Sequence, residues 1–209
     1  EGLWVDRKAA AIKAYNEWQP IRTNVSDSAI IYRDIPFGNL VDLMMVDTRL
    51  VGRSKQESAT NTAALADTNR TILGTQQMTW LRNQLGSTTA TWKIMGNQVM
   101  FAPLRIFGFA VNADQWDGYV ADRNRITSFI ENNSINNFVV LTGDIHSSWA
   151  NDIPKSNYNG QTGTTFGVEF VTPGVTSSGL PASIPANLIS SANPHIKGYD
   201  LTKRCYLML

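Results

Sequence analysis

The chain contains, at residues 137–148, the stretch NFVVLTGDIHSS, in which an apolar segment stops at a glycine and is followed by a carboxylate and an imidazole. The apolar part predicts a buried strand. In an extended segment residues i and i+2 point to the same side, so Asp144 and His146 are expected to face one point while Ile145 faces away. Gly143 would permit a sharp turn or a close approach to a ligand. The stretch therefore indicates either a metal site or a strand that ends in an ordinary polar turn.

The composition limits the classes of protein to which the chain can belong. It has 209 residues, 43% of them hydrophobic, which is enough for one large domain or two small ones. The formal net charge is +1 and the basic residues are dispersed, which argues against a nucleic-acid groove. The single cysteine, Cys205, excludes an intrachain disulfide framework. No apolar run reaches the roughly 18 residues of a transmembrane segment, and the first residues lack the features of a signal peptide.

Apolar strands alternate with amphipathic helices along the chain. The predicted helices lie at about 6–18, 75–85 and 121–131, and the predicted strands lie at 40–46, 92–95, 138–141 and 167–172. Two long loops are expected, a polar one at 53–70 and one rich in glycine and aromatic residues at 103–119. This alternation indicates an α/β layered domain. The chain starts without methionine and ends on an apolar, strand-like run at 205–209, so we expect a fragment of a longer protein.

Polar side chains follow three of the predicted strands. They are Asp47 with Arg49, Asn97 with Gln98, and Asp144 with His146. In open α/β sheets ligands bind at this edge, so the three strand ends are expected to converge on one site. Carboxylate oxygen, imidazole nitrogen and amide oxygen together suit calcium, manganese, iron or zinc rather than a metal held by thiolates.

Two arginines are candidates for holding a phosphate or carboxylate group, Arg49 after the first strand and Arg123 near the start of the third helix. A metal ion with arginines beside it favours phosphoryl transfer. For Arg49 a salt bridge to Asp47 or another carboxylate is the alternative interpretation. A cation near a helix start is mildly unfavourable with the helix dipole, which favours a functional role for Arg123 slightly.

Several blocks of the sequence resemble the PhoD-like alkaline phosphatases, in order along nearly the whole chain. These blocks are LMMVDTR at 43–49, WKIMGNQVM at 92–100, DQWDGY at 114–119, LTGDIHSSW at 141–149, VEFVTP at 168–173 and NPHIK at 193–197. The resemblance implies a calcineurin-like metallophosphoesterase fold, a β-sandwich flanked by helices, with residues 1–209 as the C-terminal portion of a single catalytic domain. It also implies hydrolysis of small-molecule phosphate monoesters and diesters with calcium and iron. Members of this family are exported to the periplasm, cell envelope or medium, commonly through a twin-arginine signal.

The same resemblance assigns roles to individual residues. Asp144 and His146 correspond to the C-terminal metal-binding motif, and Asn97 corresponds to a position whose amide meets metal and phosphate. Asp117 is expected as a further metal ligand, although Asp-Gly is also an ordinary turn dipeptide. Gln98 stands where many relatives in the wider superfamily carry histidine, which argues against a histidine acid there. The early ligands of the family, a cysteine and an Asp-Asp-His block, would precede residue 1.

Other functions remain open at this stage. The missing early ligands and the presence of only two histidines leave room for a non-catalytic binding or structural module that keeps the fold. A serine hydrolase built on Ser147 or Ser148 is disfavoured because no G-x-S-x-G elbow occurs. His195, which follows Asn193 and Pro194, is either a substrate-side residue or a capping histidine. The oligomeric state is not indicated by the sequence.

Overall fold

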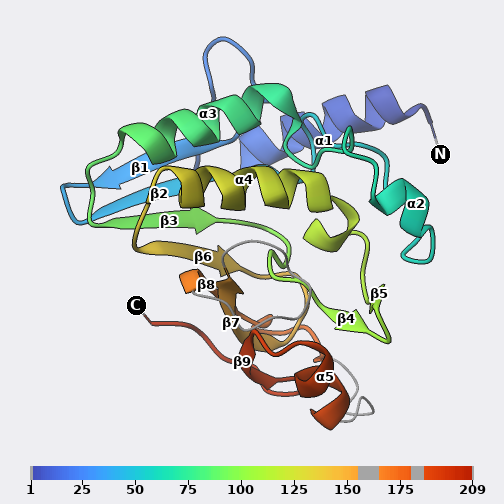
Figure 1. The fold of residues 1–209 in the computed structure, drawn as a ribbon. Helices are drawn as coiled ribbons and strands as arrows, with labels where there is room; N and C mark the ends of the chain where they lie inside the picture. Colours follow the sequence, from blue (N-terminus) through green and yellow to red (C-terminus); the bar gives the residue numbers. More distant parts are fainter. Residues whose placement is uncertain (1, 155–164, 180–185, 209) are drawn as a thin grey trace.

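A computed structural model describes residues 2–154, 165–179 and 186–208 (Figure 1). Its main feature is a seven-stranded mixed sheet with the strand order β1-β2-β3-β6-β8-β7-β9. These strands are β1 (Arg33–Phe37), β2 (Val41–Met45), β3 (Trp92–Gly96), β6 (Phe138–Thr142), β8 (Thr165–Val171), β7 (Ser148–Pro154) and β9 (Ile196–Asp200). A separate hairpin pairs β4 (Arg105–Ile106) with β5 (Phe109–Ala110). The helices are α1 (Trp4–Trp18), α2 (Thr62–Leu65), α3 (Gly74–Ser87), the 3-10 turn η1 (Trp116–Gly118), α4 (Val120–Asn132) and α5 (Ala186–Ala192).

The centre of the sheet is parallel, because β2, β3, β6 and β8 all run in one direction. The helices α3 and α4 connect three of these strands and lie together over one face of the sheet (Figure 1). Their apolar stripes bury Leu81 and Leu85 of α3 and Ile126 and Ile130 of α4 against the strands. The helices predicted at 75–85 and 121–131, and the four predicted strands, are confirmed with ends that differ by a few residues.

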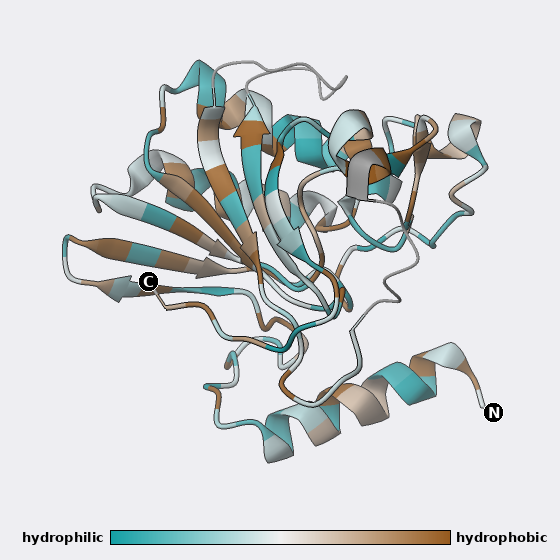
Figure 2. Ribbon diagram, turned by 90° about the horizontal axis from the view of Figure 1, so that it is seen from below, coloured by the Kyte–Doolittle hydropathy of each residue, from teal (hydrophilic) through white to brown (hydrophobic). Residues whose placement is uncertain are grey.

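The opposite face of the central strands is less well covered. In β2 the side chains alternate, so that Asp42 and Met44 are buried while Leu43 and Met45 are half-buried. Figure 2 shows apolar residues recurring along the strands of the sheet. The expected α/β class is confirmed. Within the described residues the strands form one large sheet and one small hairpin, rather than two large sheets that face each other.

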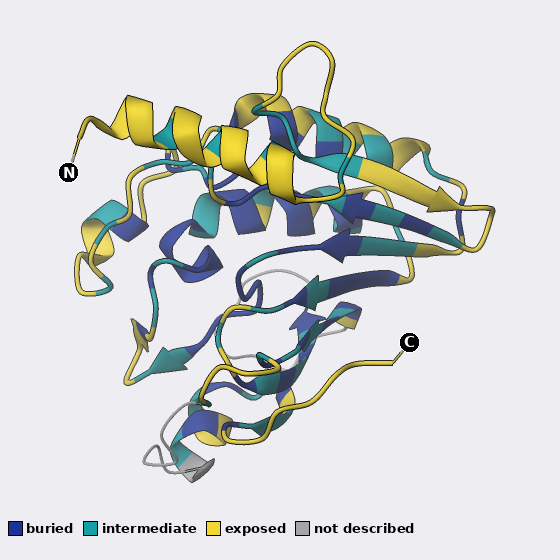
Figure 3. Cartoon of the chain, turned by 180° about the vertical axis from the view of Figure 1, so that it is seen from behind, coloured by how far each residue is buried: buried dark blue, intermediate teal, exposed yellow. Residues whose placement is uncertain are grey.

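The helix expected at 6–18 is confirmed as α1, but it does not pack by an apolar stripe. None of its residues is buried, and Trp18 remains 83% exposed. Figure 3, seen from behind, shows this exposed helix in front of the sheet, with α4 behind the strands. No helix in the described part of the chain is both long and apolar enough to cross a bilayer.

Five strands and one chain end differ from the sequence-based expectation, and two of these strands, β4 and β5, lie in the segment 103–119 that was predicted as a loop. The strands β1, β7 and β9 were not predicted, because each mixes polar and apolar residues without a clear period of two. The terminal run predicted as strand-like is irregular over 203–208. Gly86, which directly follows the helix predicted at 75–85, lies inside α3.

Candidate functional site

The carboxyl ends of β2, β3 and β6 lie side by side at one edge of the sheet. Gly96 stands opposite Met45 on one side and opposite Leu141 on the other. The ladder continues past the strands, because Val46 N–H donates to the Gly96 carbonyl at 3.0 Å and Asn97 N–H donates to the Leu141 carbonyl at 2.9 Å. The polar segments that follow these strands are therefore neighbours.

The turn after β6 carries the candidate metal ligands in an unusual conformation. Asp144 has a φ of 72° and His146 a φ of 58°, and Ile145 N–H bonds to the Gly143 carbonyl at 2.9 Å. The prediction that this segment is extended was wrong, since both residues are left-handed. Gly143, in contrast, needs neither a positive φ nor a close approach. Left-handed non-glycine residues each cost roughly 1–3 kcal/mol and cluster at functional sites.

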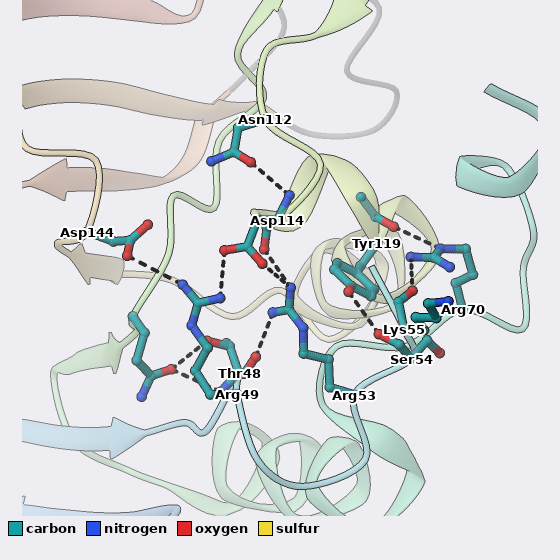
Figure 4. Close-up of polar contacts among 12 residues, drawn as sticks. Thr48, Arg49, Arg53, Ser54, Lys55, Arg70, Asn112, Asp114, Tyr119 and Asp144 are labelled. Atoms are coloured by element: carbon teal, nitrogen blue, oxygen red, sulfur yellow. Dashed lines mark hydrogen bonds and ion pairs between the residues drawn. The ribbon is translucent and has the colours of Figure 1, made fainter. Parts of the chain in front are cut away.

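Arg49 connects this turn to the loop before η1 (Figure 4). Its Nη1 lies 2.6 Å from Asp114 Oδ2, and its Nη2 lies 3.4 Å from Asp144 Oδ1. Asp114 also receives a second arginine, with Arg53 Nη2 at 2.5 Å from Oδ1. The Asp47 carboxylate takes no part in these ion pairs, because its Oδ1 accepts the backbone N–H groups of residues 49 and 50. The two alternatives for Arg49 were a phosphate contact and a salt bridge to a carboxylate. The structure contains salt bridges, and their partners are Asp114 and Asp144 rather than Asp47.

Gln98 ties the end of β3 to the end of β2. Its Oε1 accepts hydrogen bonds from the Thr48 N–H at 3.0 Å and from the Thr48 hydroxyl at 2.8 Å, while its Nε2 donates to the Val46 carbonyl. An amide both donates and accepts, which a carboxylate or an ammonium cannot do. The side chain that stands in place of a superfamily histidine thus fixes the backbone that leads to Arg49.

Asn97 is nearly buried and fully oriented. Its Nδ2 donates to the Val99 carbonyl and, at 3.2 Å, to Thr142 Oγ1, while its Oδ1 accepts from Trp116 Nε1 at 3.1 Å. A carbonyl oxygen has two lone pairs, so one acceptor position on Oδ1 remains. The amide is held rigidly beside the carboxyl end of β6.

Asp117 and Arg123 form a buried ion pair. Arg123 Nη1 lies 2.9 Å from Asp117 Oδ1, and each side chain is 1% exposed. Both also bond to the loop that follows β3, because Asp117 Oδ2 accepts the Leu104 N–H at 2.8 Å and Arg123 Nη1 donates to the Phe101 carbonyl at 3.2 Å. A role as metal ligand or phosphate donor would require this pair to separate.

Glu169 of β8 is a residue that the sequence-based reasoning did not single out for the site. Its fully buried carboxylate accepts four hydrogen bonds, from Phe101 N–H (2.6 Å), Ala102 N–H (2.8 Å), Thr142 Oγ1 (2.7 Å) and Asn151 Nδ2 (3.0 Å). Burial raises the pKa of this carboxyl group above its ordinary value, and the four donors act against that rise. The only sequence signal was an acidic residue inside an apolar strand.

His195 is buried next to the same loop. Its Nε2 lies 2.8 Å from the Pro103 carbonyl, which can only accept, so Nε2 carries the proton. Burial lowers the pKa of the imidazole. Of the two roles left open by the sequence, this contact supports the structural one.

The chemistry of the turn suits a metal ion but does not complete a metal site. Asp144 and His146 offer a carboxylate and an imidazole, both exposed, and His146 forms no hydrogen bond or ion pair within the described ranges. Over those same ranges, no three histidine, cysteine or acidic residues come together in a cluster that could hold a cation. Further ligands would have to come from other residues of the protein.

The centre of the sheet is parallel, and charged and amide side chains gather at its carboxyl edge. These two features place the protein in the class of α/β domains that bind ligands at this edge. The chain belongs to the PhoD-like phosphatase family, whose model matches residues 1–209. It is 36% identical to alkaline phosphatase D of Bacillus subtilis (strain 168) over an alignment 209 positions long, which covers 94% of this chain and 36% of that protein. A solved structure described as the structure of PhoD superposes with a TM-score of 0.83 at 35% sequence identity, covering 98% of this chain and 42% of the solved one. The chain thus spans less than half the length of either relative.

Proposed function

We propose that the protein containing this chain hydrolyses phosphate esters at the carboxyl edge of the sheet, with Asp144, His146 and Arg49 at the reacting group. The observation that carries the proposal is the strained turn itself, where a carboxylate and an imidazole are exposed and the carboxylate contacts the guanidinium of Arg49. Family membership and the name of the Bacillus relative, alkaline phosphatase D, support the same reaction class. The substrate is a small-molecule phosphate monoester or diester.

Each side chain has a defined part in this proposal. Asp144 and His146 are ligands of a metal centre, with calcium and iron as the proposed ions, and Asn97 offers its amide oxygen to metal or phosphate. A bound cation would supply an activated water and neutralise charge on the phosphate. Arg49 presents planar donors that match two phosphate oxygens. Because Asp117 and Arg123 are already bonded to each other, we propose that they act by holding the loop at 101–104 unless the pair opens.

The test uses the full-length protein, with metal analysis and hydrolysis of mono- and bis-(p-nitrophenyl) phosphate. Asn adopts left-handed backbone far more readily than Ala, so Asp144→Asn and His146→Asn replace the carboxylate and the imidazole by a neutral, weaker ligand without straining the turn further. Both variants are expected to lose bound metal and most activity. Asp34→Asn on the exposed edge strand β1 serves as the control and should change neither. Wild-type activity and metal content in both turn variants would rule out these assignments.

The second candidate is a non-catalytic module that keeps the fold. It is favoured by the incomplete set of metal-binding side chains among the residues whose structure is described. Calorimetric titration of the full-length protein with calcium or iron separates the two candidates, because a ligand that binds only the native state releases or absorbs heat and raises the melting temperature. No heat and no thermal shift would favour the inert module.

We also propose that the protein is exported, as the resemblance implies. Fractionation of cells that express the full-length protein tests this, because an enzyme found entirely in the cytoplasm would contradict it.

A further inference from the structure

Four charged side chains form a continuous chain of ion pairs at the proposed phosphate site. Arg53 contacts Asp114, Asp114 contacts Arg49, and Arg49 contacts Asp144, with N···O distances of 2.5, 2.6 and 3.4 Å (Figure 4). The exposed fraction of the side chains rises along this chain from 12% at Arg53 to 25% at Asp114 and 39% at Arg49. The inner members are therefore fixed in the protein, and the outer ones face solvent.

Arg53 is the member of this series of ion pairs that the protein holds most firmly. Its Nη1 donates to the Thr48 carbonyl at 2.8 Å, its Nη2 donates to the Asp114 carbonyl at 3.0 Å, and its guanidinium lies 4.8 Å from the centre of the Tyr119 ring. Asp114 is held from its other side, because its own N–H donates to Asn112 Oδ1 at 2.9 Å. Both the backbone and the carboxylate of Asp114 are thus fixed before Arg49 makes any contact.

We propose that Asp114 is a positioning residue, which holds the Arg49 guanidinium beside the Asp144 turn in the orientation needed to receive a phosphate group. The contact of Arg49 with Asp114, at 2.6 Å, is shorter than its contact with Asp144, at 3.4 Å. Asp114 therefore sets the orientation, and Asp144 is the partner that Arg49 can exchange for another anion. This inference rests on the proposed function, in which Arg49 binds phosphate.

The charges of the cluster support this division of roles. The charges of the two arginines and the two aspartates cancel when all four side chains are paired. If the Asp144 side chain leaves Arg49 to bind a metal ion, the remaining three side chains, Arg53, Asp114 and Arg49, carry a net charge of +1. Asp114 then keeps Arg49 in place. An arginine held through one edge retains further N–H donors in a rigid plane, which is the geometry that binds two phosphate oxygens.

The test compares Asp114→Asn with the wild type in the full-length protein by two readouts. The first is the rate at which phenylglyoxal modifies Arg49, followed by peptide mass spectrometry with and without inorganic phosphate. This rate should rise in the variant, and phosphate should protect Arg49 less. The second is competitive inhibition by inorganic phosphate, whose inhibition constant should rise on the order of tenfold, as expected for loss of one oriented charge-assisted hydrogen bond.

Two further variants separate positioning from a purely structural role. Glu57→Gln removes another acidic partner of an arginine, since Glu57 lies 3.9 Å from Arg70 in the segment between β2 and α2, and it should change neither readout. In an Arg49→Met background, Asp114→Asn should not raise the phosphate inhibition constant further, because both changes act through one guanidinium. If Asp114→Asn does not fold, Arg53→Lys loosens the same carboxylate and should give the same rise in Arg49 reactivity.

The outcomes are distinct. An Asp114→Asn protein that melts at a lower temperature while Arg49 reactivity and phosphate inhibition stay at wild-type values would overturn the positioning role. The modification rate does not depend on turnover, so a rise in Arg49 reactivity in a protein that hydrolyses no phosphate ester would support the positioning of Arg49 while refuting the proposed function.

Discussion

The Thr142 hydroxyl donates a 2.7 Å hydrogen bond to the buried carboxylate of Glu169, and the same oxygen accepts a 3.2 Å hydrogen bond from the Asn97 amide. Thr142 is the last residue of β6 and stands two positions before Asp144. One carboxylate on β8 therefore sets the ends of both β3 and β6, from which the candidate ligands project. A group that is buried and saturated with donors in this way stabilises one arrangement of the site.

Replacing Glu169 by Gln is expected to destabilise the protein. The amide nitrogen of Gln would face one of the donors that now point at the carboxylate, and two opposed donors leave a buried group unsatisfied. The expected loss is about 1–3 kcal/mol in the free energy of unfolding, measured by urea denaturation. Glu17→Gln on the exposed helix α1 is the control and should be neutral.

The same variant gives a pH dependence of known sign. Because burial raises the pKa of Glu169 above 4.5, the folded state binds this proton more tightly than the unfolded state. The contribution of Glu169 to stability is then complete below the unfolded pKa and is lost as the pH rises through the folded pKa. The stability advantage of the wild type over Glu169→Gln should therefore shrink as the pH rises above about 4.5. An advantage that grows over this range would contradict the direction of the shift.

The contribution of His195 to stability is predicted to depend on pH with the opposite sign. Burial lowers the pKa of its imidazole below 6.5, so the unfolded state takes up the proton first as the pH falls. The wild type should lose stability below about pH 6.5 relative to His195→Gln, which keeps an N–H donor for the Pro103 carbonyl but does not titrate. Parallel thermal melts from pH 4.5 to 7.5 measure the difference. Identical pH profiles for the two proteins would show that the pKa of His195 is the same in the folded and unfolded states, which would contradict the lowered pKa.

The parts of the fold that the sequence predicted are those with a simple periodic signal. The apolar runs of β2, β3 and β6 and the stripes of α3 and α4 are local patterns, and the site at their carboxyl ends follows from the rule for parallel sheets. The strand β7 pairs with β8, the next strand of the sequence, and with β9, which lies farther away. Their own residues carry little information about that pairing.

The site was predictable in its location but not in its contacts. Nothing local indicates that Asp144 and His146 are left-handed, since the backbone of this turn is imposed by its surroundings. The pairing of Arg49 with Asp114 joins residues 65 positions apart, and that of Arg53 with Asp114 joins residues 61 apart. Such long-range ion pairs leave no periodic trace in a single sequence.

The glycines near the site differ sharply in their tolerance of a side chain. A Cβ atom at Gly118 would lie 1.9 Å from the Ala113 carbonyl oxygen, whereas a Cβ atom at Gly143 would meet nothing within 4 Å. Gly118→Ala is expected to destabilise the protein by about 1–3 kcal/mol or more through overpacking. Gly143→Ala should change stability by less than about 0.5 kcal/mol. Chemical denaturation of the pair checks this, and equal effects would mean that η1 can move away from the Ala113 loop.

Substitutions in the buried pair of Asp117 and Arg123 discriminate between its two interpretations. Breaking a buried ion pair from one side leaves an uncompensated charge, so Asp117→Asn and Arg123→Met should each lower the free energy of unfolding by about 3–5 kcal/mol. The double variant should lose less than the sum of the two, because neither charge then remains unpaired.

Metal analysis of the same full-length variants decides the functional question. If Asp117 is a ligand, metal content falls in Asp117→Asn and stays at the wild-type level in Arg123→Met, although both variants lose stability. If the pair only holds the loop at 101–104, both variants bind metal alike, since each weakens one contact with that loop. Asp117→Asn weakens the contact with the Leu104 N–H, and Arg123→Met removes the contact with the Phe101 carbonyl. The comparison of the two single variants is therefore more informative than either alone, because the loss of packing is common to both and the loss of a carboxylate ligand is not.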